Sequence, residues 1–495
     1  MSPSDPENAV DAVATSASPS RYTLTTAVFL RLLALVYFAA FVSTGVQILG
    51  LAGEQGILPV GTHIAELRAA HGWAGFWQFP TLFWLNASDQ ALYGASLAGC
   101  LFSVTLFFNW LPRVSLALLF VLYLSLFHAG QLFMNFQWDY LLLESGFLAI
   151  FLGDGNRPTV WLLRWLLFRL RFLSGASKLL SHDPTWAGLT ALNYFFEVQP
   201  LPHWGGWYAH LLPEWMLRFA TGATLFIELV VPFMMFMPRR IRFVGGWLTI
   251  LMQVAILLTT NHNYANVLVL VLCLFLFDDQ ALSRVVPPKL AERVMRRPLA
   301  PALPGFAGGA LTGMIAASLL TASGFQMWGM LSGRENPAPV DKALGWLQPF
   351  HVVNRYHVFP TMKTERIELV IEASRDGVHW VPWEFKYKPG DPKRRPEVIV
   401  PHHPRIDWLM WFVPESPIFL PWFESLLTRL LENSPHVVTL MGPDPFGALP
   451  PLELRVSVYR YHFTDAATRA ATGAWWTREY LGPFLPLPGL SAERH

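Results

Sequence analysis

Residues 171–213 read RFLSGASKLLSHDPTWAGLTALNYFFEVQPLPHWGGWYAHLLP. This stretch carries a lysine, Lys178, to the end of an apolar run and continues as an aromatic loop, residues 181–213, which holds no Lys or Arg. An ordinary membrane span ends in a short polar turn. We therefore expect the functional part of the chain to lie here.

The composition indicates a membrane protein around this stretch. The chain of 495 residues is 53% hydrophobic and 14% charged, and it contains apolar runs of about 20 residues, the length that crosses a bilayer. Its net charge of +2 gives no case for nucleic-acid binding. The sequence predicts a multi-pass α-helical membrane protein with about nine spans: 24–50, 90–109, 113–133, 138–153, 159–180, 214–237, 242–260, 264–277 and 306–331.

Basic residues occupy every second connection between these spans, and the alternate connections nearly lack them. Loops rich in Lys and Arg stay on the cytoplasmic side of a membrane. We therefore expect a cytoplasmic amino terminus and an extracytoplasmic region after residue 331. The basic positions are Arg113; Arg157 and Arg164; Arg239, Arg240 and Arg242; and Arg284, Lys289, Arg293, Arg296 and Arg297.

Three segments follow from these patterns. Residues 1–23, rich in Ser, Pro and Ala, predict a disordered cytoplasmic tail rather than a signal peptide. Residues 24–331 form the predicted transmembrane domain, and residues 335–495 form a predicted extracytoplasmic domain. The only two cysteines, Cys100 and Cys273, lie in apolar runs, which excludes a disulfide framework and a cysteine-based zinc site.

The predicted outer domain is antiparallel and β-rich, with short helices. Residues 367–374 and 378–388 alternate apolar and polar side chains on either side of the turn Arg375-Asp376-Gly377, which predicts a hairpin. Residues 452–463 predict another strand. Two helices are expected at 404–412 and 421–433, because helical spacing there begins at a proline.

Charged residues inside the spans are the first candidates for function, because each costs about 2.5–3.5 kcal/mol at mid-bilayer. Arg171, Gly175 and Lys178 fall on one face of a predicted helix. Either Glu144 or Glu228 is expected to face this stripe. One interpretation is an internal ion pair that holds helices together; the alternative is a polar pocket that opens outward, with Lys178 at its floor as a base.

The loop and the outer domain hold further polar candidates. Asp183-Pro184 has the form of a helix start with a capping aspartate. Trp186 is typical of the aromatic belt at a membrane surface. His402 and His403 have no third ligand at metal-binding spacing, so we expect no metal and no cofactor.

Two blocks of the chain resemble the lipase maturation factor family. The first runs from Gly175 to Pro213 through the motifs D-x-x-W, E-x-Q-P, W-Y and H-x-x-P, and it ends at FIELVVP, residues 226–232. The second is RYHVFPTMKTERIELVIEASRDGVHWVPWEFKYKPGDP followed by PHHPRIDWLMWF, within residues 355–412. Together these blocks span most of the chain from residue 171 onward.

The resemblance implies a protein that assists the folding and assembly of secreted clients such as lipases, in contact with the lipid bilayer. It implies the endoplasmic-reticulum membrane for a eukaryotic member and the inner membrane for a bacterial one, and this cysteine-poor chain looks like the bacterial type. The implied client or ligand pocket holds Gly175, Asp183, Trp186, Glu197, Gln199, Pro200, His210 and Glu228. The implied surface of the β domain holds Tyr356, Asp376, Trp380, Asp407 and Trp408.

A weaker similarity connects Gly175, Lys178 and Leu179 with the vitamin K-dependent carboxylase and its horizontally transferred relatives, in which a lysine in this setting is the base. The counterpart of that family's catalytic histidine is missing, since the position holds Trp138 or Asp139. The leading hypothesis is therefore a maturation factor without a complete catalytic set. An integral-membrane enzyme with Lys178 as its base is the alternative, and a transporter-like or structural protein is a third option.

Overall fold

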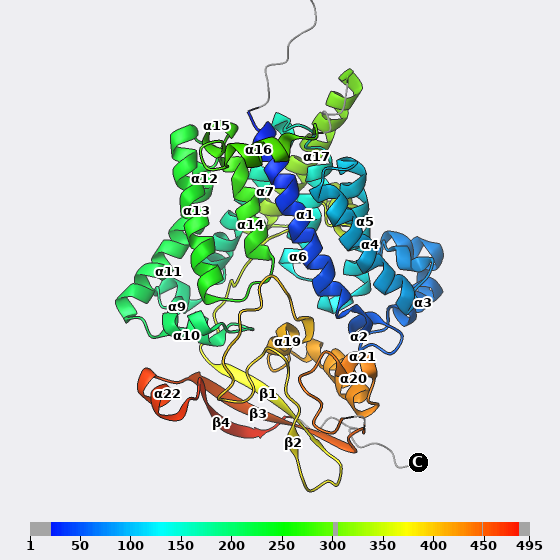
Figure 1. Ribbon diagram of the computed structural model, residues 1–495, viewed down its shortest axis with the longest axis vertical. Helices are drawn as coiled ribbons and strands as arrows, with labels where there is room; N and C mark the ends of the chain where they lie inside the picture. Colours follow the sequence, from blue (N-terminus) through cyan, green and yellow to red (C-terminus); the bar gives the residue numbers. More distant parts are fainter. Residues whose placement is uncertain (1–20, 300–304, 448, 485–495) are drawn as a thin grey trace, which may run out of the picture.

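The computed structural model describes residues 21–299, 305–447 and 449–484, so the predicted tail at 1–23 lies almost wholly outside the described residues. Figure 1 shows helices stacked side by side in one half of the molecule and a small twisted sheet at the other end. The predicted class, a multi-pass helical membrane protein with a C-terminal antiparallel sheet, is confirmed.

The helical half begins at residue 23, and local signals in the sequence set many of its boundaries. Asn156 caps the helix that starts at Arg157, because its side-chain oxygen accepts a hydrogen bond from the Thr159 amide at 3.0 Å. Pro112 opens another helix at a position where no backbone donor is lost. The main helices are α1 (Thr23–Gly45), α2 (Ile48–Ala52), α3 (Val60–His71), α4 (Asp89–Phe107), α5 (Pro112–Ala129), α6 (Gln137–Ile150), α7 (Arg157–Leu180), α11 (Glu214–Leu229), α12 (Val231–Met234), α13 (Arg239–Thr259), α14 (Ala265–Cys273), α15 (Asp279–Leu282), α16 (Pro288–Met295), α17 (Gly305–Ser332) and α18 (Ala338–Leu347).

Five of these helices are long and apolar enough to cross a membrane, within the described residues. They cover Thr23–Gly45, Asp89–Phe107, Pro112–Ala129, Arg239–Thr259 and Gly308–Ser332. Each of the nine predicted spans coincides with a helix, although α6, α11 and α14 are shorter than the others. The count of nine stays a prediction.

Helix α7 carries too many charges to count among the apolar spans, yet it packs against α6, α11, α14 and α17 inside the bundle. Four of its cationic side chains are buried: Arg164, Arg169, Arg171 and Lys178. Buried cations need partners, because a lone charge is costly in a medium of low polarity. The partners of α7 therefore decide how the bundle is held together.

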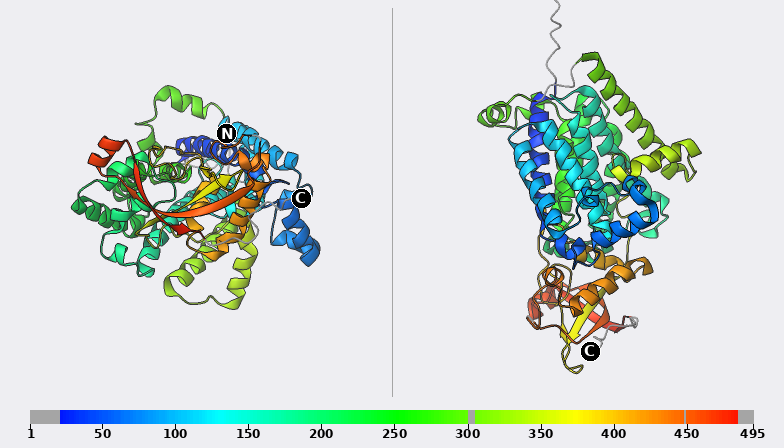
Figure 2. Two further views of the ribbon diagram at one scale, coloured as in Figure 1. Left: turned by 90° about the horizontal axis from the view of Figure 1, so that it is seen from below. Right: turned by 90° about the vertical axis from the view of Figure 1, so that its right-hand side faces the viewer.

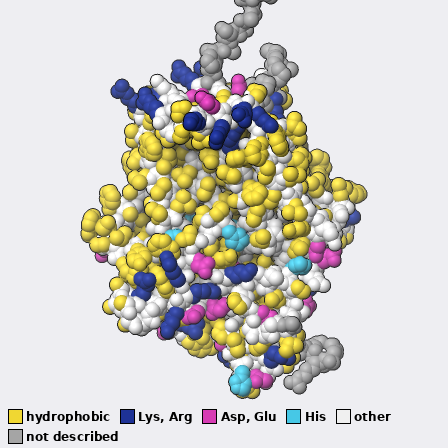
Figure 3. All heavy atoms as spheres, in the orientation of Figure 1, with side chains coloured by type: hydrophobic (Ala, Val, Ile, Leu, Met, Phe, Trp, Pro, Cys, Tyr) yellow, Lys and Arg dark blue, Asp and Glu magenta, His cyan; other side chains and the backbone are white. Residues whose placement is uncertain are grey.

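Charged side chains are distributed unequally along the molecule. Figure 3 shows Lys and Arg gathered at one end, a band of hydrophobic side chains below it, and charges of both signs towards the sheet. Figure 1 shows that α15, α16 and the start of α1 lie at the basic end, opposite the sheet. The hydrophobic band is the part of the surface that suits a bilayer.

The C-terminal sheet has four antiparallel strands in the order β2-β1-β3-β4. β1 (Arg366–Ser374) pairs along its whole length with β3 (Glu453–Phe463), and β4 (Trp476–Pro483) completes one edge. Short helices cover the sheet or join its strands: α19 (Arg405–Leu409), α20 (Leu420–Leu431), α21 (Pro435–Val438) and α22 (Ala466–Thr472). The left view of Figure 2 shows the sheet from its end of the molecule.

The predicted second strand of the hairpin, 378–388, is wrong for most of its length. Only Val381–Pro382 pairs with β1, as β2. Pro382 has no amide hydrogen for the ladder, and Lys388 turns inward to a buried carboxylate. The other predicted strands are confirmed as β1 and β3, the predicted helices as α19 and α20, and the turn by Gly377 at φ 73°.

The helical half and the C-terminal half share a hydrophobic cluster. Leu51, Ile57 and Phe133 from the helical half belong to the cluster that also holds Trp422 and Leu426 of α20. The rings of Phe133 and Trp422 meet edge to face, with their centroids 5.6 Å apart. The two halves are therefore packed against each other, not merely connected by a linker.

Candidate functional site

The chain that leads from the helical half to the sheet lies against α6 and the C-terminal part of α7. We call residues 354–366 the strap. Polar groups along the strap bind residues of the helical half at short intervals, which fixes its course. The pairs are Asn354 and Tyr356 with Glu144, the Val358 carbonyl with Lys178, the Pro360 carbonyl with Ser181, the Met362 amide with Asp183, and Arg366 with the Glu197 carbonyl.

Lys178, the partner of the Val358 carbonyl, is 3% exposed. Its ammonium group donates to Glu228 Oε2 at 2.7 Å, to the Val358 carbonyl at 2.8 Å and to the Ser174 carbonyl at 3.3 Å. These bonds occupy all three donors of the side chain. The ring of Trp186 lies 5.0 Å from the nitrogen.

Glu228 is the carboxylate that faces Arg171 and Lys178 on α7. Its carboxylate also lies 4.0 Å from Arg171, so one anion serves two buried cations. Gly175 makes this approach possible, because an added Cβ would lie 2.8 Å from the Cβ of Glu228. This geometry is that of an internal ion pair, and Lys178 as a base stays a prediction.

Glu144 forms the second buried pair, with Arg169 of α7. Its other oxygen accepts hydrogen bonds from the Asn354 amide at 3.0 Å and from the Tyr356 hydroxyl at 2.9 Å. Arg169 also donates to the Asn354 carbonyl at 3.1 Å. The strap therefore completes an ion pair that two helices begin.

Asp139 forms the third pair, and its partner comes from α19. Arg405 donates to both carboxylate oxygens, at 2.7 and 2.8 Å, in the two-pronged geometry that guanidinium groups favour. The hydroxyls of Tyr123 and Tyr264 donate to the same carboxylate at 2.6 and 2.8 Å. All four side chains are fully buried. This contact joins α5, α6 and the chain before α14 to the C-terminal half.

The loop 181–213 forms three short helices, α8 (Pro184–Ala187), α9 (Ala191–Val198) and α10 (Trp204–His210). The predicted cap is confirmed, because Asp183 accepts from the Thr185 amide at 2.8 Å. Its other oxygen accepts from the Met362 amide at 2.9 Å. Burial opposes ionisation of this carboxyl, but hydrogen bonds from Thr185 and Met362 outweigh it and lower the pKa of Asp183.

Glu197 joins the loop to the sheet. Its carboxylate accepts from the Phe463 amide at 2.7 Å and lies 3.2 Å from the ring nitrogen of His462, at the end of β3. The ring of His210 lies 3.9 Å from the same carboxylate. Arg366 of β1 donates to two backbone carbonyls that follow Glu197, to that of Gln199 at 2.6 Å and to that of Pro200 at 3.2 Å.

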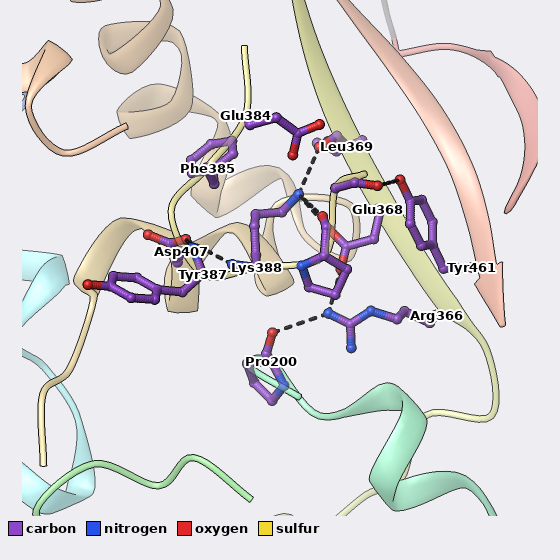
Figure 4. Close-up of polar contacts among 12 residues, drawn as sticks. Pro200, Arg366, Glu368, Leu369, Glu384, Phe385, Tyr387, Lys388, Asp407 and Tyr461 are labelled. Carbon is purple, nitrogen blue, oxygen red and sulfur yellow. Dashed lines mark hydrogen bonds and ion pairs between the residues drawn. The ribbon is translucent and has the colours of Figure 1, made fainter. Parts of the chain in front are cut away.

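A buried charge cluster lies behind these contacts, in the C-terminal half (Figure 4). Glu368 accepts from Arg366 at 2.5 Å and from Lys388 at 2.8 Å, and Lys388 also donates to the Leu369 carbonyl. Burial disfavours the charged carboxylate, but Lys388 and Arg366 outweigh burial and lower the pKa of Glu368. Asp407 accepts from the amides of Tyr387 and Lys388, yet its burial raises its pKa.

Three residues predicted for the surface of the β domain are buried instead. Tyr356 is closed off by its bond to Glu144, Asp407 by the amides it accepts from, and Trp408 by aromatic packing against Trp138. Asp376 is exposed in the turn after β1, and Trp380 is half-buried beneath Arg455. The hydropathy pattern of the sequence does not distinguish a polar side chain that faces solvent from one that is buried in a polar contact.

The structure brings most of the predicted pocket residues to one junction, but as neighbours in separate contacts. Gly175, Lys178, Trp186 and Glu228 meet on one side, and Glu197, Gln199, Pro200 and His210 meet at the sheet. Sequence reasoning missed Arg366, Glu368, Lys388 and Arg405. The one local signal was the spacing of Arg366 and Glu368, which places both on the same face of a strand.

The junction therefore offers rigidity rather than an open catalytic centre. Each buried carboxylate described above already has a hydrogen-bond or ion-pair partner, and within the described residues no group of three His, Cys, Asp or Glu side chains is placed to hold a metal. Satisfied buried networks fix one relative placement of the parts they join. The exposed rim of the junction is the part available to another molecule.

Comparison with known proteins gives one consistent result. A family model of the lipase maturation factor transmembrane domain matches residues 24–284, and one of the lipase maturation factor C-terminal domain matches residues 352–486. Lipase maturation factor 1 of Bos taurus is 34% identical, over 94% of this chain and 88% of its own length. Lipase maturation factor 2 of Gallus gallus is 33% identical, over 92% and 80% respectively.

Lipase maturation factor 2 of Xenopus laevis is 34% identical, over 91% of this chain and 80% of its own length. No solved structure shows a significant match to the chain. The matched models and these relatives are all lipase maturation factors, so the similarity to the carboxylase finds no support.

Proposed function

The chain belongs to the lipase maturation factor family, and we propose that it assists the folding or assembly of secreted clients such as lipases from within the membrane. One observation carries the proposal. The two matched segments are joined by the buried ion pair of Asp139 with Arg405, and by hydrogen bonds that connect Tyr356 and the Val358 carbonyl with two further buried pairs of the helical half. The loop 181–213 and the sheet are thereby held as one platform, which suits a factor that presents a fixed surface to a client.

We also propose how the protein is oriented in the membrane. The sheet end lies outside the cytoplasm, because Lys and Arg gather at the opposite end of the hydrophobic band (Figure 3). Residues 24–331 then form the transmembrane part and residues 335–495 the outer part. The protein resides in the endoplasmic-reticulum membrane of a eukaryote or in the inner membrane of a bacterium.

The client surface that we propose lies on the edge strand β4. Among the described strands, β4 pairs only with β3, so its outer edge presents backbone groups to which an extended chain can pair. Tyr480 is 57% exposed and Leu481 is 41% exposed on this strand, outside every candidate span. Exposed apolar side chains that water would surround are typical of a surface that meets a partner.

Removing these two side chains should weaken client maturation. In cells that express a secreted lipase from the same genome, the double variant Tyr480→Ala, Leu481→Ala should lower active lipase in the medium. Truncating a central aromatic contact costs about 2 kcal/mol, or about 30-fold in affinity. The measurement is lipase activity per lipase polypeptide, at equal amounts of the membrane protein.

Trp247→Ala is the matched control, since Trp247 is 60% exposed on α13, a candidate membrane span. It should leave lipase activity unchanged. Equal activity with wild-type protein and with the β4 variant would refute the proposed surface. Equal activity with and without the whole chain would refute the proposed function.

A further inference from the structure

A cavity of about 1170 Å³ lies on the flank of the bundle, next to the start of the strap. Its walls come from α3 and the chain after it, the last turn of α5 and the chain after it, the start of α6, and the segment from the end of α18 to His351. The right view of Figure 2 shows α18 and α3 on the same flank of the molecule. None of the contacts assigned to the client surface reaches this cavity.

The cavity wall is aromatic and carries no formal charge. Its sixteen lining residues include no Asp, Glu, Lys or Arg, although they include Trp77, Phe79, Phe127, Trp346 and Phe350. A phosphate or an ammonium group would lose its hydration there without gaining an opposite charge. The wall therefore selects an uncharged ligand with a large apolar part.

Polar groups in the wall are suited to hydroxyls and ester carbonyls. The side chains of Gln78 and Gln348 make no hydrogen bond within the described residues, which leaves amide donors and acceptors free. His128 Nε2 lies 2.8 Å from the Pro349 carbonyl, which only accepts, so this nitrogen carries the proton and Nδ1 is left as an acceptor.

The cavity reaches the level of the bilayer. Phe127 and His128 lie in the last turn of α5, a candidate membrane span. Trp77 and Trp346 line the cavity while 67% and 70% exposed, and tryptophan in such positions is typical of the membrane interface. A molecule in the adjoining leaflet can therefore enter without crossing water.

We propose that this cavity binds an uncharged glycerolipid, such as a diacylglycerol, from the leaflet on the side of the sheet. The acyl chains lie along the aromatic wall, and the glycerol hydroxyl and ester groups bond to Gln78, Gln348 and His128. The volume exceeds the roughly 300–1000 Å³ of pockets for drug-sized ligands, as two acyl chains require.

The test uses a diacylglycerol with a photoreactive group in one acyl chain and the full-length protein in phosphatidylcholine nanodiscs. Labelled peptides should come from residues 72–79 and 338–351, and unlabelled dioleoylglycerol should suppress the labelling. The proposal would be overturned if phosphatidylserine or added phosphatidylcholine suppressed the labelling as strongly as dioleoylglycerol does. Labelling that avoids both peptides would overturn it as well.

Gly345→Trp blocks the cavity without an initial clash, because a Cβ added at Gly345 meets no atom within 4 Å. The indole takes space that acyl CH₂ groups would fill. Each CH₂ group that stays unburied loses about 0.8 kcal/mol of binding free energy, so labelling should fall about tenfold. Gly94→Trp on α4 is the matched control, since its Cβ is equally unobstructed outside the cavity. An equal effect of both variants, or of neither, would overturn the assignment.

Discussion

Replacing Arg405 with methionine should destabilise the protein by about 3–5 kcal/mol, since it leaves Asp139 as a buried charge without its cation. The hydroxyls of Tyr123 and Tyr264 remain, but neutral donors compensate a carboxylate only in part. Thermal unfolding in detergent, followed by tryptophan fluorescence, and the yield of monodisperse protein measure the effect.

The matched control is Arg455→Met, which breaks the pair of Arg455 with Glu372 on the sheet, where Arg455 is half-exposed. Exposed ion pairs contribute about 0–1 kcal/mol, so this variant should unfold close to the wild-type temperature. If Arg405→Met were as mild as the control, the buried pair would not join the helical and C-terminal halves, and the platform would lose its basis.

The second large effect is expected from Glu228→Gln. The substitution keeps the size of the side chain and one acceptor for Lys178, but it removes the negative charge that Lys178 and Arg171 share. Two buried cations then lack an anion, which should cost about 3 kcal/mol or more. The same unfolding measurement applies. An unchanged unfolding temperature would contradict the structural role of the pair.

Combining Lys178→Met with Glu228→Gln distinguishes a structural role of Lys178 from a chemical one. The double variant Lys178→Met, Glu228→Gln should be more stable than the sum of the two single losses, by about 0.5–3 kcal/mol, because the residues are in contact. A folded double variant that still supports lipase activity excludes Lys178 as a base. A folded double variant without activity would assign Lys178 a chemical role.

Local patterns in the sequence anticipated much of this fold. Apolar runs located the helices because bilayer thickness sets their length, and the alternation in β1 and β3 and the cap at Asp183 depend only on neighbouring residues. Gly175 and Lys178 pointed for the same reason to a close helix contact with either Glu144 or Glu228, and Glu228 is the one in contact. The helix period puts both on one face.

What could not be predicted depends on partners far away in the chain. Asp139 and Arg405 lie 266 positions apart, and no local pattern connects them. The predicted hairpin failed because β1 takes β3, not the adjacent segment, as its main partner. β4 was missed since its sequence, WTREYLGP, is largely exposed and carries no apolar alternation.

The central claim is that the sheet end of this membrane protein meets the client, and site-specific photo-crosslinking tests it most directly. Benzoylphenylalanine replaces Tyr480 in one variant and Trp247 in the other, two exposed aromatic positions, of which the first lies on β4 and the second within the candidate span α13. The account predicts a crosslink to the co-expressed secreted lipase from position 480 and none from position 247. A lipase crosslink of equal strength from both positions, or from 247 alone, would contradict it.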